Sequence, residues 1–265
     1  MSEKQRLDIV MHQRGLAPSR EKARGMIMAG EVSVNGVMVD KPGVRVNDGD
    51  TVTVQSKPRF VSRGGEKLEG ALLDFQFSVT GKVCADVGAS TGGFTDCLLQ
   101  FGAAKVYAID VGYGQIDYTL RQDSRVIVME RTNARYLTAL AEKVTLAVVD
   151  ASFISLKLLI PAIKLWLMPE ADIITLVKPQ FEAGKSDVGK GGVVRDAAIH
   201  ARVLEEITEF SQSQGFIVAG LTISPIKGPS GNVEFLMWLH QGSDLPAVDL
   251  AERIPQLTTL YNDSQ

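Results

Sequence analysis

One stretch decides how this chain folds, and it reads Lys82-Val83-Cys84-Ala85-Asp86-Val87-Gly88-Ala89-Ser90-Thr91-Gly92-Gly93-Phe94-Thr95-Asp96. Its apolar beginning predicts a short buried strand over 82–87, followed by a tight glycine loop and a helix that opens near Gly92 or Gly93. Glycines let a backbone approach a ligand closely, and the free N–H groups of the helix start face that ligand. Strand, glycine loop and helix in this order indicate a cofactor-binding site.

The acidic residues of this stretch indicate which cofactor it holds. A dinucleotide fingerprint offers N–H groups to a pyrophosphate, and a carboxylate inside the loop would repel that anion. Here Asp86 ends the strand and Asp96 lies in the first helical turns, so a cationic ligand fits better. S-adenosylmethionine meets this requirement, because its sulfonium and α-ammonium are positive while its carboxylate can accept from the glycine N–H groups.

A second strand signal supports the same interpretation. The apolar run 105–109 ends at Asp110, which lies 110 − 86 = 24 positions after Asp86. An acidic residue near that offset is placed to hold a nucleoside ribose. The alternative is that both acids only terminate strands and the glycines only turn the chain. The candidate cofactor contacts are Asp86, Gly88, Ser90, Gly92, Gly93, Phe94 and Asp110.

Length and composition set the class of protein. A chain of 265 residues with 45% apolar residues predicts one or two domains with a sizeable core. Both cysteines, Cys84 and Cys97, lie in the cofactor stretch, which suits a reducing cytoplasm better than a disulfide framework. The polar N-terminus lacks a signal-peptide core, and the most apolar run, 156–168, is too short to span a membrane. We therefore expect a soluble cytoplasmic protein without a membrane partner. The histidines lack ligand spacing, so no metal site is predicted.

The formal charge of −3 is unevenly distributed. Residues 1–60 hold 10 Lys/Arg and 7 Asp/Glu, a balance of 10 − 7 = +3, and the other 205 residues carry 18 − 24 = −6. A basic head on an acidic body indicates that the head meets a polyanion. A solvated surface would carry a charge of this size equally well.

The basic head reads as a small α+β module. Helices are predicted over 6–14 and, with Ser19 as N-cap, over 19–30, followed by short strands around the Asn35-Gly36 turn. The segment 57–63 is the predicted linker, with a head domain over 1–56 and a larger domain over 64–265. A helix that displays Arg and Lys can lie across RNA phosphates. The candidate RNA contacts are Arg6, Arg20, Lys22, Arg24, Arg59 and Arg63.

The head resembles the alpha-L RNA-binding motif of a ribosomal small-subunit protein, pseudouridine synthases and tyrosyl-tRNA synthetases. The resemblance rests on Arg6-Leu7-Asp8, Ser19-Arg20-Glu21-Lys22-Ala23, Gly30-Glu31-Val32-Ser33-Val34-Asn35-Gly36 and Asp48-Gly49-Asp50. A protein-binding module is the alternative.

Strand and helix signals alternate through the larger domain. Strands are predicted over 126–129, 145–149, 173–177, 215–223 and 233–239, and helices over 66–75, 94–101, 117–121, 136–143, 156–167 and 196–213. This alternation predicts an α/β fold, a mostly parallel Rossmann-like sheet with both faces covered. Ligands in such sheets lie beyond the carboxyl ends of the strands. Asp86, Asp110, Asp150 and Lys178 all fall at predicted strand ends, and therefore on one rim.

The charges of this rim suit methyl transfer to a ribose hydroxyl. Such a hydroxyl is a poor nucleophile, so a base must take its proton during attack. Lys178 and Lys67, close together, could supply that base, with Asp150 compensating their charge. Glu234 interrupts the apolar strand 233–239 and is the further acid, although alone it would suit the exposed face of an edge strand. The glycine- and lysine-rich segment 184–192 is either a flexible surface connection or a functional loop, which would act as a lid or as an RNA contact through Lys185 or Lys190.

Residues 6–240 as a whole resemble the TlyA family of ribosomal RNA cytidine 2′-O-methyltransferases, often labelled hemolysin A. The catalytic domain is similar to the FtsJ/RrmJ type, a class I methyltransferase with a Lys-Asp-Lys-Glu tetrad. The stretches that carry the resemblance are Ser62-Arg63-Gly64-Gly65-Glu66-Lys67-Leu68, Asp86 to Asp96, Asp110-Val111-Gly112-Tyr113-Gly114-Gln115, Asp150-Ala151-Ser152-Phe153-Ile154-Ser155 and Val177-Lys178-Pro179-Gln180-Phe181-Glu182.

The resemblance implies a role for each residue of the tetrad and for one more. Lys67, Asp150, Lys178 and Glu234 fill the tetrad, with Lys178 as the proton acceptor. Asn133 falls where the family contacts the adenine of S-adenosylmethionine. The implied substrate is ribosomal RNA of the large subunit, with the small subunit as a second possibility. A non-catalytic ribosome-assembly factor and a membrane-lytic hemolysin are the alternatives.

Overall fold

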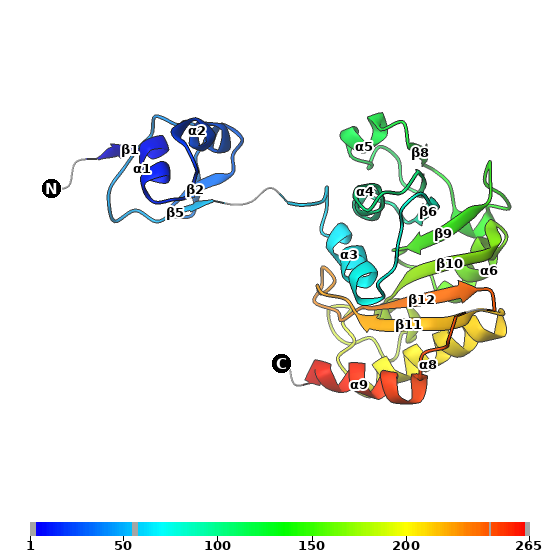
Figure 1. The fold of residues 1–265 in the computed structure, drawn as a ribbon. Helices are drawn as coiled ribbons and strands as arrows, with labels where there is room; N and C mark the ends of the chain where they lie inside the picture. Colours follow the sequence, from blue (N-terminus) through cyan, green and yellow to red (C-terminus); the bar gives the residue numbers. More distant parts are fainter. Residues whose placement is uncertain (1–3, 55–57, 244, 263–265) are drawn as a thin grey trace. The chain divides into compact units, whose positions relative to one another are not determined.

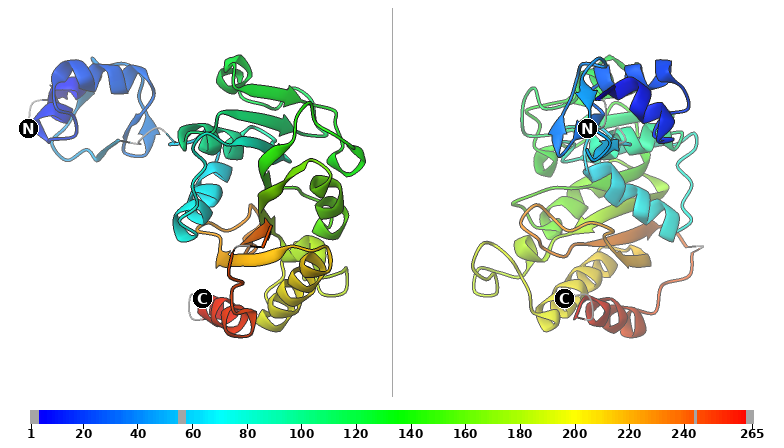
Figure 2. Two further views of the ribbon diagram at one scale, coloured as in Figure 1. Left: turned by 45° about the vertical axis from the view of Figure 1, so that its right-hand side comes forward. Right: turned by 90° about the vertical axis from the view of Figure 1, so that its left-hand side faces the viewer.

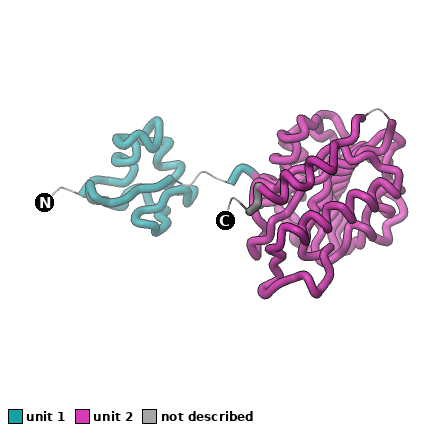
Figure 3. The backbone as a smooth tube through the Cα atoms, turned by 90° about the horizontal axis from the view of Figure 1, so that it is seen from below, with its two compact units in different colours: residues 1–59 teal, residues 60–265 magenta. Residues whose placement is uncertain are grey.

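The computed structural model describes residues 4–54, 58–243 and 245–262, with side chains to residue 259. The chain divides into two compact units, residues 1–59 and 60–265 (Figure 3). This division falls inside the predicted linker 57–63, of which Lys57 lies outside the described residues.

The first unit is the small α+β module that the sequence predicts. Its elements are β1 (Gln5–Arg6), α1 (Leu7–Gln13), α2 (Arg20–Met28), β2 (Val32–Val34), β3 (Val37–Met38), β4 (Arg45–Val46) and β5 (Val52–Val54). The Ser19 hydroxyl caps α2 by accepting from the Lys22 N–H at 3.1 Å. Asn35 and Gly36 both have positive φ, which a two-residue hairpin turn between β2 and β3 requires. Leu7, Met11 and Ile27 are fully buried and close the core between the helices and the sheet.

The second unit is built on a seven-stranded sheet with the order β11-β12-β10-β9-β6-β7-β8 (Figure 1). Its strands are β6 (Val83–Val87), β7 (Lys105–Ile109), β8 (Val126–Met129), β9 (Val144–Val149), β10 (Leu167–Val177), β11 (Ile217–Ile223) and β12 (Phe235–Gln241). β10, β9, β6, β7 and β8 are parallel, and β12 is antiparallel to both of its neighbours. The prediction of a mostly parallel sheet is confirmed.

Helices cover both faces of this sheet, as Figure 2 shows. They are α3 (Gly64–Asp74), α4 (Gly93–Gln100), α5 (Tyr118–Gln122), α6 (Leu156–Lys164), α7 (Pro179–Glu182), α8 (Ala197–Ser213) and α9 (Leu250–Asn262), with a 3-10 turn η1 (Ala134–Tyr136). Neighbouring residues of β6 point to opposite faces, so Cys84 packs with the α3, α4 and α5 side chains and Ala85 with those of α6, α8 and α9. None of the helices in the described part of the chain has the length and apolar character to cross a membrane.

The helix predicted over 136–143 is wrong. Only the single turn η1 forms there, and the chain then runs without regular structure to β9. The Leu137 carbonyl accepts from the Trp166 indole N–H at 2.9 Å, and the Glu142 carboxylate pairs with Lys105 at 2.5 Å. These contacts are made by a segment without regular structure, although its composition favours a helix.

Three further elements differ from the prediction. β10 begins at Leu167 rather than at 173, because residues 167–177 are needed to reach both β9 and β12. The helix predicted over 156–167 accordingly ends at Lys164. The C-terminal helix α9 was not predicted, and it packs against α8 with Ile254 and Leu257 buried.

Candidate active site at the carboxyl end of the sheet

Strand direction brings three of the four predicted tetrad residues, Asp150, Lys178 and Glu234, to one rim. Asp150 and Lys178 directly follow the parallel strands β9 and β10. β12 runs the other way, and its first residue, Phe235, pairs with Val177 at the end of β10. Glu234 therefore lies at the same rim, just before β12 rather than inside the strand as the sequence suggested. Because β12 is antiparallel to β10, the residues at its start lie at the same edge of the sheet as the residues at the end of β10.

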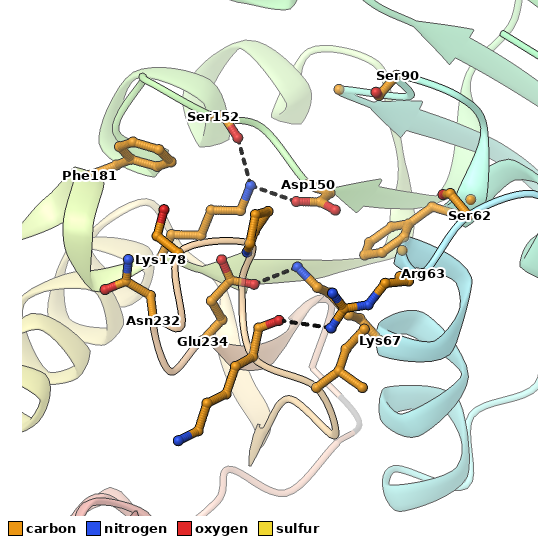
Figure 4. A pocket seen from close by; sticks show the side chains of 18 of the residues that line it. Ser62, Arg63, Lys67, Ser90, Asp150, Ser152, Lys178, Phe181, Asn232 and Glu234 are labelled. Carbon is orange, nitrogen blue, oxygen red and sulfur yellow. Dashed lines mark hydrogen bonds and ion pairs between the residues drawn. The ribbon is translucent and has the colours of Figure 1, made fainter. Parts of the chain in front are cut away.

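A cavity of about 740 Å³ opens at this rim, and all four tetrad residues line it (Figure 4). Lys67 comes from the first turn of α3, and Asp150, Lys178 and Glu234 come from the sheet rim. Other lining residues are Ser62, Arg63, Gly88, Ser90, Gly93, Phe94, Ser152, Phe153, Gln180, Phe181 and Asn232. Residues 167 positions apart in the chain thus share one cavity.

The four side chains form two lysine–carboxylate pairs. Lys67 Nζ lies 2.5 Å from Glu234 Oε2, and Lys178 Nζ lies 2.6 Å from Asp150 Oδ1. Lys67 and Lys178 are each 7% exposed and Glu234 is 1% exposed. Charges buried this far need a partner of opposite sign, and each lysine has one.

Two residues outside the tetrad complete its hydrogen bonds. Lys178 Nζ also donates to Ser152 Oγ at 2.9 Å, and the Gln180 amide donates to Glu234 Oε1 at 3.3 Å. Neither was a predicted site residue, although each lies two positions after a tetrad member. Gly228 approaches from the other side, where a Cβ would lie 2.6 Å from Glu234 Oε1. The Glu234 carboxylate is therefore held on several sides.

The segment 184–192 is anchored beside the cavity. Asn232 is 3% exposed, and its amide donates to the Gly192 carbonyl at 2.9 Å and accepts from the Val194 N–H at 3.0 Å. Gly192 lines the cavity, whereas Lys185 and Lys190 are exposed. The sequence had singled out the glycines and lysines of this segment but not the asparagine that fixes its end.

A second cavity, of about 510 Å³, adjoins the first and shares Gly88, Ser90 and Asp150 with it. Asp110 and Asn133, both predicted cofactor contacts, line it. The Asp110 carboxylate accepts the N–H groups of Ser90 at 2.8 Å and Gly112 at 2.6 Å. Each of its oxygens keeps a further lone pair, which can accept from a ribose hydroxyl. A mostly apolar cavity with a few convergent polar groups fits a nucleoside.

Asp86 lies beneath these cavities. It is fully buried, its Oδ2 accepts from Thr95 Oγ1 at 2.6 Å, and its Oδ1 has no hydrogen-bond partner among the described residues. Burial raises the pKa of Asp86 to about 7, against the hydrogen bond from Thr95. Gly93 and Phe94 line the larger cavity, whereas neither Asp86 nor Gly92 is among the described residues that line either cavity.

The glycines of the loop also bring protein segments together. Gly88 has a φ of +86°, and a Cβ on it would lie 2.8 Å from the Asp150 carbonyl oxygen. At Gly93 a Cβ would lie 2.9 Å from the Gly65 nitrogen, at the start of α3. Side chains at these positions would push Asp150 and the start of α3, which carries Lys67, away from the rim. The glycines thus set the tetrad geometry as well as giving a ligand access.

The predicted RNA contacts have different surroundings. Arg6 and Arg20 lie 3.0 and 3.3 Å from the buried carboxylate of Asp8, and the hydrogen bond from Arg6 holds the pKa of Asp8 below its usual value. Lys22 and Arg24 are exposed on α2. In the second unit Arg63 lines the larger cavity and donates to the Lys227 carbonyl at 3.4 Å. Arg59 is exposed.

Within residues 4–54, 58–243 and 245–262 no group of three or more His, Cys, Asp or Glu side chains could hold a metal ion. Cys84 and Cys97 are buried as thiols.

Two family models match this chain. Residues 60–241 match the FtsJ-like methyltransferase family, and residues 5–52 match the S4 domain. The two matches fall in the two compact units.

Individual proteins are similar over nearly the whole chain. "Putative rRNA methyltransferase YqxC" of Bacillus subtilis is 50% identical, over 94% of this chain and 92% of that protein. "16S/23S rRNA (cytidine-2'-O)-methyltransferase TlyA" of Mycobacterium tuberculosis is 48% identical, over 92% of each chain. The solved structure "Putative hemolysin from Streptococcus thermophilus" superposes with a TM-score of 0.75 at 43% identity, over 99% of this chain and 97% of that one.

Proposed function

Because this chain belongs to the FtsJ-like methyltransferase family, whose members use S-adenosylmethionine, we propose that it methylates the 2′-hydroxyl of a cytidine ribose in ribosomal RNA. Similarity over more than nine-tenths of the chain to a protein of that name supports this substrate. An S4 domain in the first unit supports an RNA partner. The proposal includes the cytoplasmic location predicted from the sequence, since ribosomes are found there.

The observation that carries the proposal is the pair of buried lysines, each with its own carboxylate, on the wall of one cavity. A binding module gains little from burying two ammonium groups, because their desolvation is costly. A site that must deprotonate a hydroxyl and stabilise the resulting negative charge has a use for both.

The donor cofactor fits the second cavity. When bound, S-adenosylmethionine supplies an electrophilic methyl group on a positively charged sulfur. Asp110 would hold its ribose and Asn133 its adenine, beside the loop of Gly88 and Ser90. Asp110 and Asp150, carboxylates on the wall of the second cavity, give it negative character, which suits a cationic ligand.

Lys178 is the proposed proton acceptor. It must be neutral when the hydroxyl attacks, so that its lone pair can take the hydroxyl proton. Asp150 orients it through the 2.6 Å contact. Lys67 is oriented by Glu234 in the same cavity and lends positive charge to the developing alkoxide.

The test is methylation of 16S and 23S ribosomal RNA, free and in subunits, by the full chain and by Lys178→Ala. We expect 2′-O-methylcytidine in at least one of the two RNAs with the wild type, and at least about a 100-fold loss of rate in the variant. Cofactor affinity, measured by calorimetry, should stay within about twofold.

A wild type that methylates neither RNA would refute the proposal. RNA binding without methylation would instead indicate a ribosome-assembly factor, and leakage of liposomes would indicate a lytic protein.

A further inference from the structure

The amine of Lys178 contacts two acceptors from one short loop. Asp150 Oδ1 lies 2.6 Å from Nζ and Ser152 Oγ lies 2.9 Å from it (Figure 4). A lysine nitrogen is tetrahedral, with one direction taken by its own side-chain carbon. The hydrogen bond to Ser152 takes one further direction, and the Asp150 carboxylate lies against the amine as an ion pair. The substrate therefore has to approach on the side that these two acceptors leave open.

The loop that carries both acceptors is held by its backbone. A Cβ on Gly88 would lie 2.8 Å from the Asp150 carbonyl oxygen and 3.0 Å from Ala151 Cα, so the loop is packed directly on the glycine. Phe153, which follows Ser152, has a φ of +63°, a conformation that non-glycine residues adopt where the surroundings demand it. Asp150 and Ser152 are therefore presented to Lys178 at fixed positions.

The geometry points to Ser152 as a positioning residue for methyl transfer. Its hydroxyl oxygen accepts one N–H of Lys178 and, with Asp150, leaves the lone pair of the neutral amine on the side that remains open. The substrate hydroxyl gives its proton to that lone pair, and the bonding electrons of the O–H bond stay on the oxygen. This inference rests on the proposed function, in which Lys178 is the base.

Ser152 acts through the charge state of Lys178 as well as through its direction. The hydroxyl oxygen is a better acceptor for an ammonium N–H than for an amine N–H. Loss of the hydroxyl should therefore make the lysine lose its proton more easily while leaving its lone pair poorly aimed. At low pH, easier loss of the proton raises the methylation rate, and the poorly aimed lone pair lowers it. A purely structural role of Ser152 would produce neither effect.

The experiment compares Ser152→Ala, Ser152→Thr and a control, Ser78→Ala, in the full chain. Ser78 is an exposed serine away from the carboxyl rim. We expect kcat of Ser152→Ala to fall about 10- to 100-fold, with KM for S-adenosylmethionine and for RNA within about twofold. The rising limb of its pH–rate profile should move to lower pH. Ser152→Thr keeps the hydroxyl and should recover most of kcat, and Ser78→Ala should match the wild type.

A second experiment measures the reactivity of Lys178 without methyl transfer. Acylation of Lys178 by a small N-hydroxysuccinimide ester, followed by mass spectrometry of the peptide, should be several-fold faster in Ser152→Ala than in the wild type. Equal kcat and equal acylation in both would overturn the inference while the proposed function stands. Equal losses in Ser152→Ala and Ser152→Thr would also overturn it, since the hydroxyl would then have no part. An inactive wild type would refute the proposed function instead.

Discussion

The two ends of the central sheet both bury a carboxylate near a lysine, and they use it differently. At the carboxyl end, Lys67 and Glu234 line a cavity together with the second pair. At the amino end, Asp172 is 7% exposed and its Oδ1 hydrogen-bonds with the Trp238 indole at 2.8 Å and His240 Nδ1 at 2.9 Å. Lys82 lies 3.8 Å from its other oxygen.

The two ends of the sheet differ in whether the buried carboxylate lines a cavity. A third cavity, of about 490 Å³, adjoins the amino end, and Lys82 and Trp238 line it, but the carboxylate of Asp172 is covered by its own partners. At the carboxyl end both members of each pair reach the cavity wall. Burial of a charge therefore does not identify an active site, because a buried charge also serves as a structural bridge. A buried charge that also faces a cavity is the better candidate for a functional group.

Removal of one charge at the carboxyl end should have the largest effect. Lys67→Met leaves Glu234 buried without its cation. We expect methyl transfer to fall at least about 100-fold and the free energy of unfolding to fall by about 3 kcal/mol. Urea unfolding and single-turnover methylation measure the two losses.

The matched control for this variant is Lys67→Met combined with Glu234→Met. Removing both charges should restore most of the stability but none of the activity. Recovery of methylation in the double variant would contradict a role for the pair in the chemistry.

A substitution at the amino end of the sheet should lower stability and leave the rate of methylation nearly unchanged. Asp172→Ala removes the acceptor of Trp238 and His240 and the anion beside Lys82. We expect the free energy of unfolding to fall by about 3 kcal/mol, because buried donors lose their partner. The rate of methylation at 25 °C should stay within about twofold. A rate loss as large as that of Lys67→Met would show that both ends of the sheet take part in catalysis.

Asp86 is a third kind of buried acidic group, and its side-chain partner among the described residues is the hydroxyl of Thr95. Its pKa is raised from 3.8 to about 7, so the native state binds more protons than the unfolded state between these values. Stability should therefore fall as the pH rises through this window, by about 2 kcal/mol between pH 5 and pH 8. Asp86→Asn should lose this dependence, which urea unfolding at the two pH values would detect. An unchanged slope in the variant would mean that other groups cause it.

Much of the candidate site could be predicted because the ends of strands can be recognised in the sequence. Asp110, Asp150 and Lys178 each follow an apolar run, and parallel strands end at one edge of their sheet. Ser152 and Gln180 could not be predicted in this way, since a polar residue in a loop carries no periodic signal. The helix predicted over 136–143 failed for a related reason. The composition of that segment favours a helix, but its contacts with the indole of Trp166 and the amine of Lys105 are made in an irregular conformation.

The mostly parallel sheet could be predicted from the chain alone, because hydrophobic periodicity and glycine placement are local properties. Which lysine pairs with which carboxylate depends on how the strands and helices pack together. Lys67 and Glu234 lie 167 positions apart and come within 2.5 Å because an antiparallel last strand returns Glu234 to the rim, while Gly93 lets the start of α3 approach it. Pairing across such separations depends on strand order and close backbone packing, which no local pattern encodes.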